Sequence, residues 1–269
     1  MSKPSFVRSW RKWLPFVAIL AMTPVLLWLE YGKALTDDEV LLPLMRMSLS
    51  RFAAAGVFLV ILLTQGYRVL NPLRAPFGRA LLYTLPAFAV VINNLPILSL
   101  IWGDAYIVHG APVYWIWFAL QSLAIGLFEE ITFRGVILLS FAESRRNNHK
   151  GLLWSILLSS AVFGAMHAVN LLTGASPVAV LMQVGYSFLI GAMCAVVLFK
   201  TANLFLCILL HAVYDFCGML LPTLGGGHWW DTPTVIFTAV LAVAVTVYMI
   251  LLFARMDLHE TDRIYEKEN

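Results

Sequence analysis

Residues 113–141 read VYWIWFALQSLAIGLFEEITFRGVILLSF, an apolar run with a few charged residues in its second half. A helix of roughly 20 apolar residues crosses a hydrocarbon core about 30 Å thick, so this segment can span a membrane. Comparable segments occur on both sides of it, at approximately 13–30, 52–70, 80–102, 152–172, 177–199, 203–221 and 234–254. The pattern predicts an all-α fold, a polytopic bundle of about eight transmembrane helices with a buried polar cavity.

The composition supports this class. Of the 269 residues, 61% are hydrophobic and 12% are charged, whereas soluble domains carry about 25% charged residues. The net charge of +3 is small and the basic residues are scattered, which argues against a nucleic-acid partner. Cys194, Cys207 and Cys217 lie in apolar runs, and we interpret them as packing residues that form no disulfide.

The charges between the predicted spans indicate the orientation of the chain. Basic residues before the first span resemble the start of a signal peptide, but no A-x-A-like site follows, so we expect a retained helix. With a cytoplasmic N-terminus, the outer side holds only Lys33, Arg46 and Arg51. The inner side holds Lys3, Arg8, Arg11, Lys12, Arg68, Arg74, Arg79, Arg145, Arg146, Lys150, Lys200, Arg255, Arg263 and Lys267. The positive-inside rule therefore predicts a multi-pass protein of the cytoplasmic membrane with both termini in the cytoplasm.

Three predicted spans contain ionisable residues, each of which costs at least about 2.5–3.5 kcal/mol near the bilayer centre. The six are Glu129, Glu130 and Arg134 in one span, His167 in the next, and His211 and Asp215 in a third. At about 1.5 Å per residue, Glu129, His167 and Asp215 lie at similar depths, roughly 22–25 Å from the basic residue at the cytoplasmic end of each helix. A shared site explains this common depth better than three unrelated sites.

Two pairs within this set can interact along their own helices. Glu130 and Arg134 are four residues apart on one helix face, which is compatible with a structural ion pair. Asp215 lies four residues after His211 and can accept a hydrogen bond that fixes the imidazole tautomer. Glu129 points about 100° away from Glu130 and has no local partner. We therefore expect Glu129 to be functional or to pair with another helix.

The three segments also form a recognisable set of motifs. Residues 129–134 have the form E-E-x-x-x-R, residues 163–167 the form F-x-x-x-H, and residues 211–215 the form H-x-x-x-D. In this order on successive membrane helices, over about residues 113–221, they resemble the CAAX prenyl protease 2 family. This group comprises Rce1-like and bacteriocin-processing (Abi or CPBP) intramembrane proteases. The resemblance implies an intramembrane endopeptidase that acts on a membrane-associated protein or peptide.

The resemblance also implies a role for each motif residue. Glu129 would be the general base that activates water, with His167 as its partner. His211 would stabilise the oxyanion, through a donor that contributes about 3–4 kcal/mol when it is preorganised. Glu130 and Arg134 complete the predicted catalytic set, as a scaffold for the reactive groups.

Asp215 departs from the family pattern, because many members have asparagine at this position. An ionised aspartate can only accept hydrogen bonds, so we predict that Asp215 orients His211 and favours its charged form. We also predict no metal or other cofactor, because there is no H-E-x-x-H helix and the histidines lie on different helices. The alternative is Zn²⁺ held by Glu129, His167 and His211.

Two non-enzymatic functions stay open at this point. A buried polar cavity also serves proton-coupled transporters, although no inverted repeat is evident here. A partner-binding or immunity protein could use the same cavity, and His167 taken alone would fit a core histidine. The predicted partners are the lipid bilayer and a membrane-associated peptide or protein substrate.

The chain is expected to have three parts. Residues 1–112 form the N-terminal transmembrane helices (about three spans by length), and residues 113–221 form the CPBP- and Rce1-like catalytic core. Residues 222–269 form the last transmembrane helix and a cytoplasmic tail. We expect the charged tail from Asp257 to Asn269 to be a solvated end, either extended or helical and lying at the surface.

Overall fold

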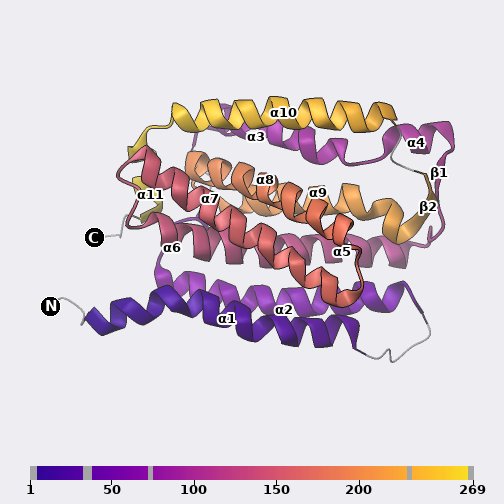
Figure 1. Ribbon diagram of the computed structural model, residues 1–269, viewed down its shortest axis with the longest axis horizontal. Coiled ribbons are helices and arrows are strands. Elements are labelled where there is room, and N and C mark those ends of the chain that lie inside the picture. The colour runs from indigo at the N-terminus through magenta and orange to yellow at the C-terminus, as the bar shows by residue number, and fades with distance from the viewer. Residues whose placement is uncertain (1–4, 33–37, 72–74, 229–231, 266–269) are drawn as a thin grey trace.

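The computed structural model describes residues 5–32, 38–71, 75–228 and 232–265 of the chain. Its helices run side by side along one axis (Figure 1). In chain order the elements are α1 (Ser5–Tyr31), α2 (Leu41–Gln65), α3 (Phe77–Asn93), α4 (Ile97–Trp102), β1 (Ala105–Ile107), α5 (Pro112–Glu129), the π-helix η1 (Glu130–Leu138), α6 (Leu139–Ala142), α7 (His149–Met166), the 3₁₀-helix η2 (His167–Thr173), α8 (Pro177–Thr201), α9 (Leu204–Leu224), β2 (Gly225–Gly227), α10 (Thr232–Ala254), the 3₁₀-helix η3 (Leu258–Thr261) and α11 (Asp262–Tyr265).

The helices have the length and composition of membrane spans. Within the described ranges, seven of them are long and apolar enough to cross a membrane. The eighth predicted span is also helical, from Pro112 to Ala142 through α5, η1 and α6. It carries Glu129, Glu130 and Arg134 and is not among these seven helices. The prediction of an all-α polytopic bundle is confirmed, and the chain is an integral membrane protein.

The helices that carry the candidate residues lie in the middle of the bundle. In Figure 1, α1 and α2 form one side, α3 and α10 the opposite side, and α5, α7, α8 and α9 lie between them. α2 packs along α5, α5 packs along α9, and α7 packs along α8. Much of the apolar surface of α10 is exposed, including Val240 and Val243, as expected of a helix that faces lipid.

The predicted boundary of the second span was wrong. The expected segment was 52–70, whereas α2 begins at Leu41, so Arg46 and Arg51 belong to the helix and not to an outer loop. Arg46 Nη1 donates to the carbonyl of Gly32 at 2.6 Å, and Arg51 forms an ion pair with the buried Glu30. Arginines can be accommodated inside a span when neighbouring groups bind their charge, and a count of loop charges cannot reveal this.

Polar caps fix where three of the central helices begin. Asn148, Ser176 and Asn203 each accept, through the side chain, a hydrogen bond from the backbone N–H three residues later. Such caps stabilise a helix N-terminus by roughly 1 kcal/mol. They set the starts of α7, α8 and α9, and hence the depth at which these helices present their side chains.

At one end of the bundle, β1 and β2 form a short antiparallel pairing, in which Tyr106 lies opposite Gly226. A side chain at Gly225 would not fit, because its Cβ would lie 2.5 Å from the carbonyl oxygen of Tyr106. Gly227 has a φ of 99°, a conformation that glycine adopts without strain. The three consecutive glycines therefore allow this close backbone pairing.

The C-terminal segment packs against the opposite end. Lys200 Nζ lies 2.6 Å from Glu260 Oε2, and Tyr265 donates its hydroxyl hydrogen to the carbonyl of Leu139 at 3.0 Å. Ile264 is completely buried. The described part of the tail is therefore helical, as one form of the expectation had it, but it packs against the bundle and is not a fully solvated end. Phe16, early in α1, also contacts this end, so the described chain begins and ends on the same side (Figure 1).

Candidate active site

Glu129 and Glu130 lie where the α-helix α5 changes into the π-helix η1. π-helical segments are rare and occur frequently at functional sites, because the wider i→i+5 turn redirects side chains. Glu130 and Arg134 are 0% and 1% exposed, and Arg134 Nη1 lies 2.9 Å from Glu130 Oε1. The Arg134 guanidinium also stacks over the Phe163 ring, 4.2 Å from its centroid. The predicted ion pair is therefore present and fully buried.

His211 joins the H-x-x-x-D motif on α9 to the glutamates of α5 and η1. Its Nδ1 lies 2.6 Å from Glu130 Oε1. Its Nε2 lies 3.4 Å from Glu129 Oε2 and 3.6 Å from Asp215 Oδ2. Carboxylate oxygens therefore face both ring nitrogens. This arrangement fits an imidazolium that donates from both nitrogens, although the 3.6 Å contact is an ion-pair distance without a hydrogen bond.

A cavity of about 1720 Å³ opens beside this cluster. Glu129, His167, His211 and Asp215 line it, and its other walls are largely apolar side chains of α1, α7, α8 and α10. Glu130 and Arg134 lie behind His211 and do not contribute to the lining. Reactive groups thus face the cavity, whereas the buried ion pair supports them from the protein side.

His167 faces the same cavity from α7 and η2. Its Nδ1 lies 3.1 Å from the carbonyl oxygen of Phe163. A carbonyl can only accept, so Nδ1 carries the hydrogen in this contact. Nε2 is then left as an acceptor, 3.4 Å from Ser187 Oγ. No hydrogen bond or ion pair joins the described side chains of His167 and Glu129, which share the cavity but not a direct contact.

Of the six predicted residues, the structure brings five into direct contact and the sixth, His167, into the shared cavity. The contacts involve Glu129, Glu130, Arg134, His211 and Asp215. These contacts are consistent with the expectation that the candidate residues of the three helices lie at a common depth. The principal difference is that His211, and not His167, is the histidine nearest to Glu129.

Two charged residues near this cluster were missed in the sequence. Arg51 Nη1 on α2 lies 3.7 Å from Glu129 Oε1, and Glu30 on α1 binds Arg51 through both carboxylate oxygens. Arg51 and Glu30 also line the cavity. The available signal was that Glu30 and Arg51 are ionisable residues flanked by apolar sequence, but Arg51 was counted as a charge of an outer loop.

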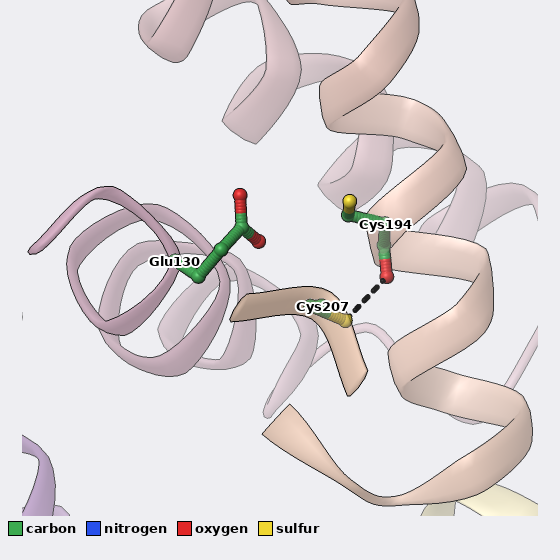
Figure 2. A group of neighbouring side chains, drawn as sticks. All are labelled: Glu130, Cys194 and Cys207. Carbon is green, nitrogen blue, oxygen red and sulfur yellow. Dashed lines mark hydrogen bonds between the residues drawn. The ribbon is translucent and has the colours of Figure 1, made fainter. Parts of the chain in front are cut away.

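The residues proposed as zinc ligands do not gather into a metal site in this geometry. Among the described residues, the one group of three ligand atoms within 4.8 Å of one another is Glu130, Cys194 and Cys207. In Figure 2 the Glu130 carboxylate faces the two cysteines, and the Cys207 thiol donates to the carbonyl of Cys194 at 3.2 Å. The guanidinium of Arg134 already binds this carboxylate, and its positive charge disfavours a metal cation beside it.

Part of the chain is similar to a known protein family. A family model described as Type II CAAX prenyl endopeptidase Rce1-like matches residues 111–217. Searches of curated proteins and of solved structures found no match. The matched residues contain all three motifs, with the glutamates, the arginine, both histidines and the aspartate. Over residues 111–217, less than half of the chain, the sequence is similar to the Rce1-like family of type II CAAX prenyl endopeptidases, which are proteases.

Proposed function

We propose that this protein is an intramembrane endopeptidase in which Glu129 and His167 activate water and His211 stabilises the oxyanion. The observation that carries the proposal is the position of Glu129 and His211. Their side chains meet at 3.4 Å on the wall of a cavity, and Glu130 holds the far side of the imidazole at 2.6 Å. A base and a hydrogen-bond donor thus lie side by side at one surface.

The proposed role of His211 follows from its hydrogen bonds. Glu130 accepts from Nδ1, which fixes the orientation of the ring and leaves the Nε2–H group facing the cavity. A donor that is held in place before reaction stabilises a developing oxyanion without reorganisation. Arg134 in turn holds Glu130. Glu130 and Arg134 accordingly act as a scaffold in this proposal.

The proposed water activation uses Glu129 and His167. Both line the cavity without touching each other, so a water molecule can lie between them. His167 presents an acceptor Nε2, because its Nδ1 hydrogen is bound to Phe163. A carboxylate and an imidazole acceptor can together orient a water and take its proton.

The proposed hydrolysis proceeds in two steps. Water loses a proton to Glu129 as its oxygen bonds to the peptide carbonyl carbon, and the carbonyl oxygen becomes an oxyanion facing His211. The proton on Glu129 passes to the leaving amine nitrogen as the C–N bond breaks. The products are a new carboxylic acid and a new amine, and Glu129 returns to its starting state.

Asp215 is proposed to orient His211 and to favour its charged form. Its Oδ2 is buried without a hydrogen-bond partner and lies 3.6 Å from His211 Nε2. A carboxylate in this position attracts a positive imidazole. The apolar walls of the cavity support a membrane-associated peptide or protein as the substrate, and the clustering of basic loops supports the cytoplasmic membrane with both termini inside.

A cleavage assay tests this function. Purified protein in detergent or liposomes is incubated with a panel of membrane-associated peptides, and mass spectrometry identifies new termini. We expect defined cleavage products with wild type and none with Glu129→Gln. A panel that stays intact with folded wild-type protein would favour a transporter or a partner-binding protein.

A further inference from the structure

Arg51 lies outside the part of the chain that matches the protease family, yet it contacts the candidate general base. It belongs to α2, whereas the match covers residues 111–217. Its Nη1 lies 3.7 Å from Glu129 Oε1, and its guanidinium lies over the Phe128 ring, 5.1 Å from the centroid. The side chain is 20% exposed, and this exposed part faces the cavity.

A second buried carboxylate holds Arg51 in this position. Arg51 Nε donates to Glu30 Oε1 at 2.6 Å, and Nη2 donates to Glu30 Oε2 at 3.0 Å. Ser50 Oγ donates to the same Glu30 oxygen at 3.0 Å. Two-pronged pairs of this kind fix the plane of the guanidinium. With Nε and Nη2 used by Glu30, Nη1 is directed at Glu129.

We propose that Arg51, anchored by Glu30, is a positioning residue for Glu129, so that helices α1 and α2 complete the active site. The inference rests on the proposed function of Glu129. Arg51 approaches one oxygen of the Glu129 carboxylate, Oε1, while His211 approaches the other, Oε2. The two cationic groups therefore restrain the rotation of the carboxylate from both sides.

The local charge balance gives Arg51 a second effect. Glu129, Glu130 and Asp215 all lie within 3.6 Å of the His211 ring nitrogens. The positive charge of Arg134 balances the negative charge of Glu130, but Arg134 lies on the side of the imidazole that faces away from the cavity. Arg51 is the guanidinium that approaches Glu129 itself, and attraction between opposite charges is strong in a poorly hydrated site. Without Arg51, the Glu129 carboxylate would be drawn toward His211 and away from the position where it meets water.

If Arg51 had a purely structural role, linking α2 to α1 through its ion pair with Glu30, different results would be expected. Loss of this ion pair would lower the stability of the fold and would change KM and kcat together. Loss of a positioning residue would act mainly on kcat, because a misplaced catalytic group affects the transition state more than the bound substrate. Kinetics and thermal unfolding measured on the same variants separate these roles.

The test compares Arg51→Gln, Arg51→Lys and the control Arg46→Gln, which removes a charge from the same helix away from the cavity. We expect Arg51→Gln to lower kcat by about 10- to 100-fold, as a small displacement of a catalytic group does, with little change in KM. Lysine should restore part of the loss, because it keeps the charge but lacks the planar fork. Arg46→Gln should match wild type. Wild-type kcat in both folded Arg51 variants would overturn the proposal.

A double-mutant cycle on thermal unfolding tests the contact without any assay of activity. Arg51→Gln and Glu129→Gln should lower Tm together by less than the sum of their separate effects, because the two side chains interact. Arg46→Gln combined with Glu129→Gln should be additive. If wild-type protein cleaves no peptide, the proposed function fails. The double-mutant cycle still shows whether Arg51 and Glu129 interact. If Arg51→Gln does not fold, Arg51→Lys takes its place in both tests, and additive Tm effects with unchanged kcat would overturn the proposal.

Discussion

The Nδ1 atom of His211 lies 2.6 Å from Oε1 of Glu130, a contact between helices whose residues are 81 positions apart in the chain. The same glutamate oxygen lies 2.9 Å from Arg134 Nη1. A buried imidazole is thereby held from behind by a carboxylate that is itself held by a guanidinium. The opposite ring nitrogen faces the cavity, where the proposed peptide hydrolysis requires a donor.

His211 and Asp215 should respond differently to substitution. His211→Gln should lower kcat by about 10²–10³-fold, the usual effect of removing one oxyanion donor. Asp215→Asn should keep most of the activity, because it retains a polar group that can orient the ring. Both are measured as peptide cleavage rates on purified, folded protein. Equal and complete loss in the two variants would contradict the separate roles.

His167 and Ser187 offer a second comparison. His167→Gln should lower kcat by about 10²–10⁴-fold, as loss of a general base does. Ser187→Ala removes only the hydroxyl 3.4 Å from His167 Nε2. Its effect should be about tenfold at most, because a neutral hydrogen bond contributes about 0.5–1.5 kcal/mol. A larger loss from Ser187→Ala than from His167→Gln would instead identify the serine as the reacting group.

The Glu130–Arg134 pair should matter for stability as well as activity. Arg134→Gln leaves Glu130 without its cation in a buried site, which costs about 3–5 kcal/mol. We expect Tm in detergent to fall by roughly 10 °C. Arg145→Gln, at an exposed position, is the matched control and should leave Tm nearly unchanged. An unchanged Tm in Arg134→Gln would show that the pair does not support the fold.

Metal dependence can be checked directly. Because the donor atoms of Glu129, His167 and His211 do not gather into a ligand set, we expect cleavage to survive treatment with a chelator. Elemental analysis of the same preparation should find no stoichiometric zinc. Zinc at one equivalent, with activity that disappears on chelation and returns on addition of zinc, would contradict the metal-free mechanism.

The sequence was sufficient for the parts of the site that depend on local periodicity. Apolar segment lengths predicted the helical bundle, and four-residue spacing predicted that Glu130 meets Arg134 and that Asp215 lies near His211. The common depth of the three helices also follows from counting residues to the basic loops. These features could be predicted because each depends either on the residue spacing within a single helix or on the thickness of the membrane that the helix spans.

The contacts between helices could not be predicted in the same way. Nothing in the spacing indicates that His211 turns its Nδ1 toward Glu130, because this depends on how α9 packs against η1 and on the change from α- to π-helix. Arg51 was missed because an arginine near an apolar segment was taken as a loop charge. Its place inside α2 depends on Glu30, which another helix supplies.

The cleavage rate of Glu129→Gln against that of Glu143→Gln tests the central claim most directly. Glutamine keeps the size of Glu129 but cannot take a proton, whereas Glu143 is exposed at the end of the bundle and outside the cavity lining. The account predicts that Glu129→Gln lowers kcat by about 10²–10⁴-fold while Glu143→Gln cleaves like wild type. A folded Glu129→Gln variant that cleaves the same bond at the wild-type rate would contradict it.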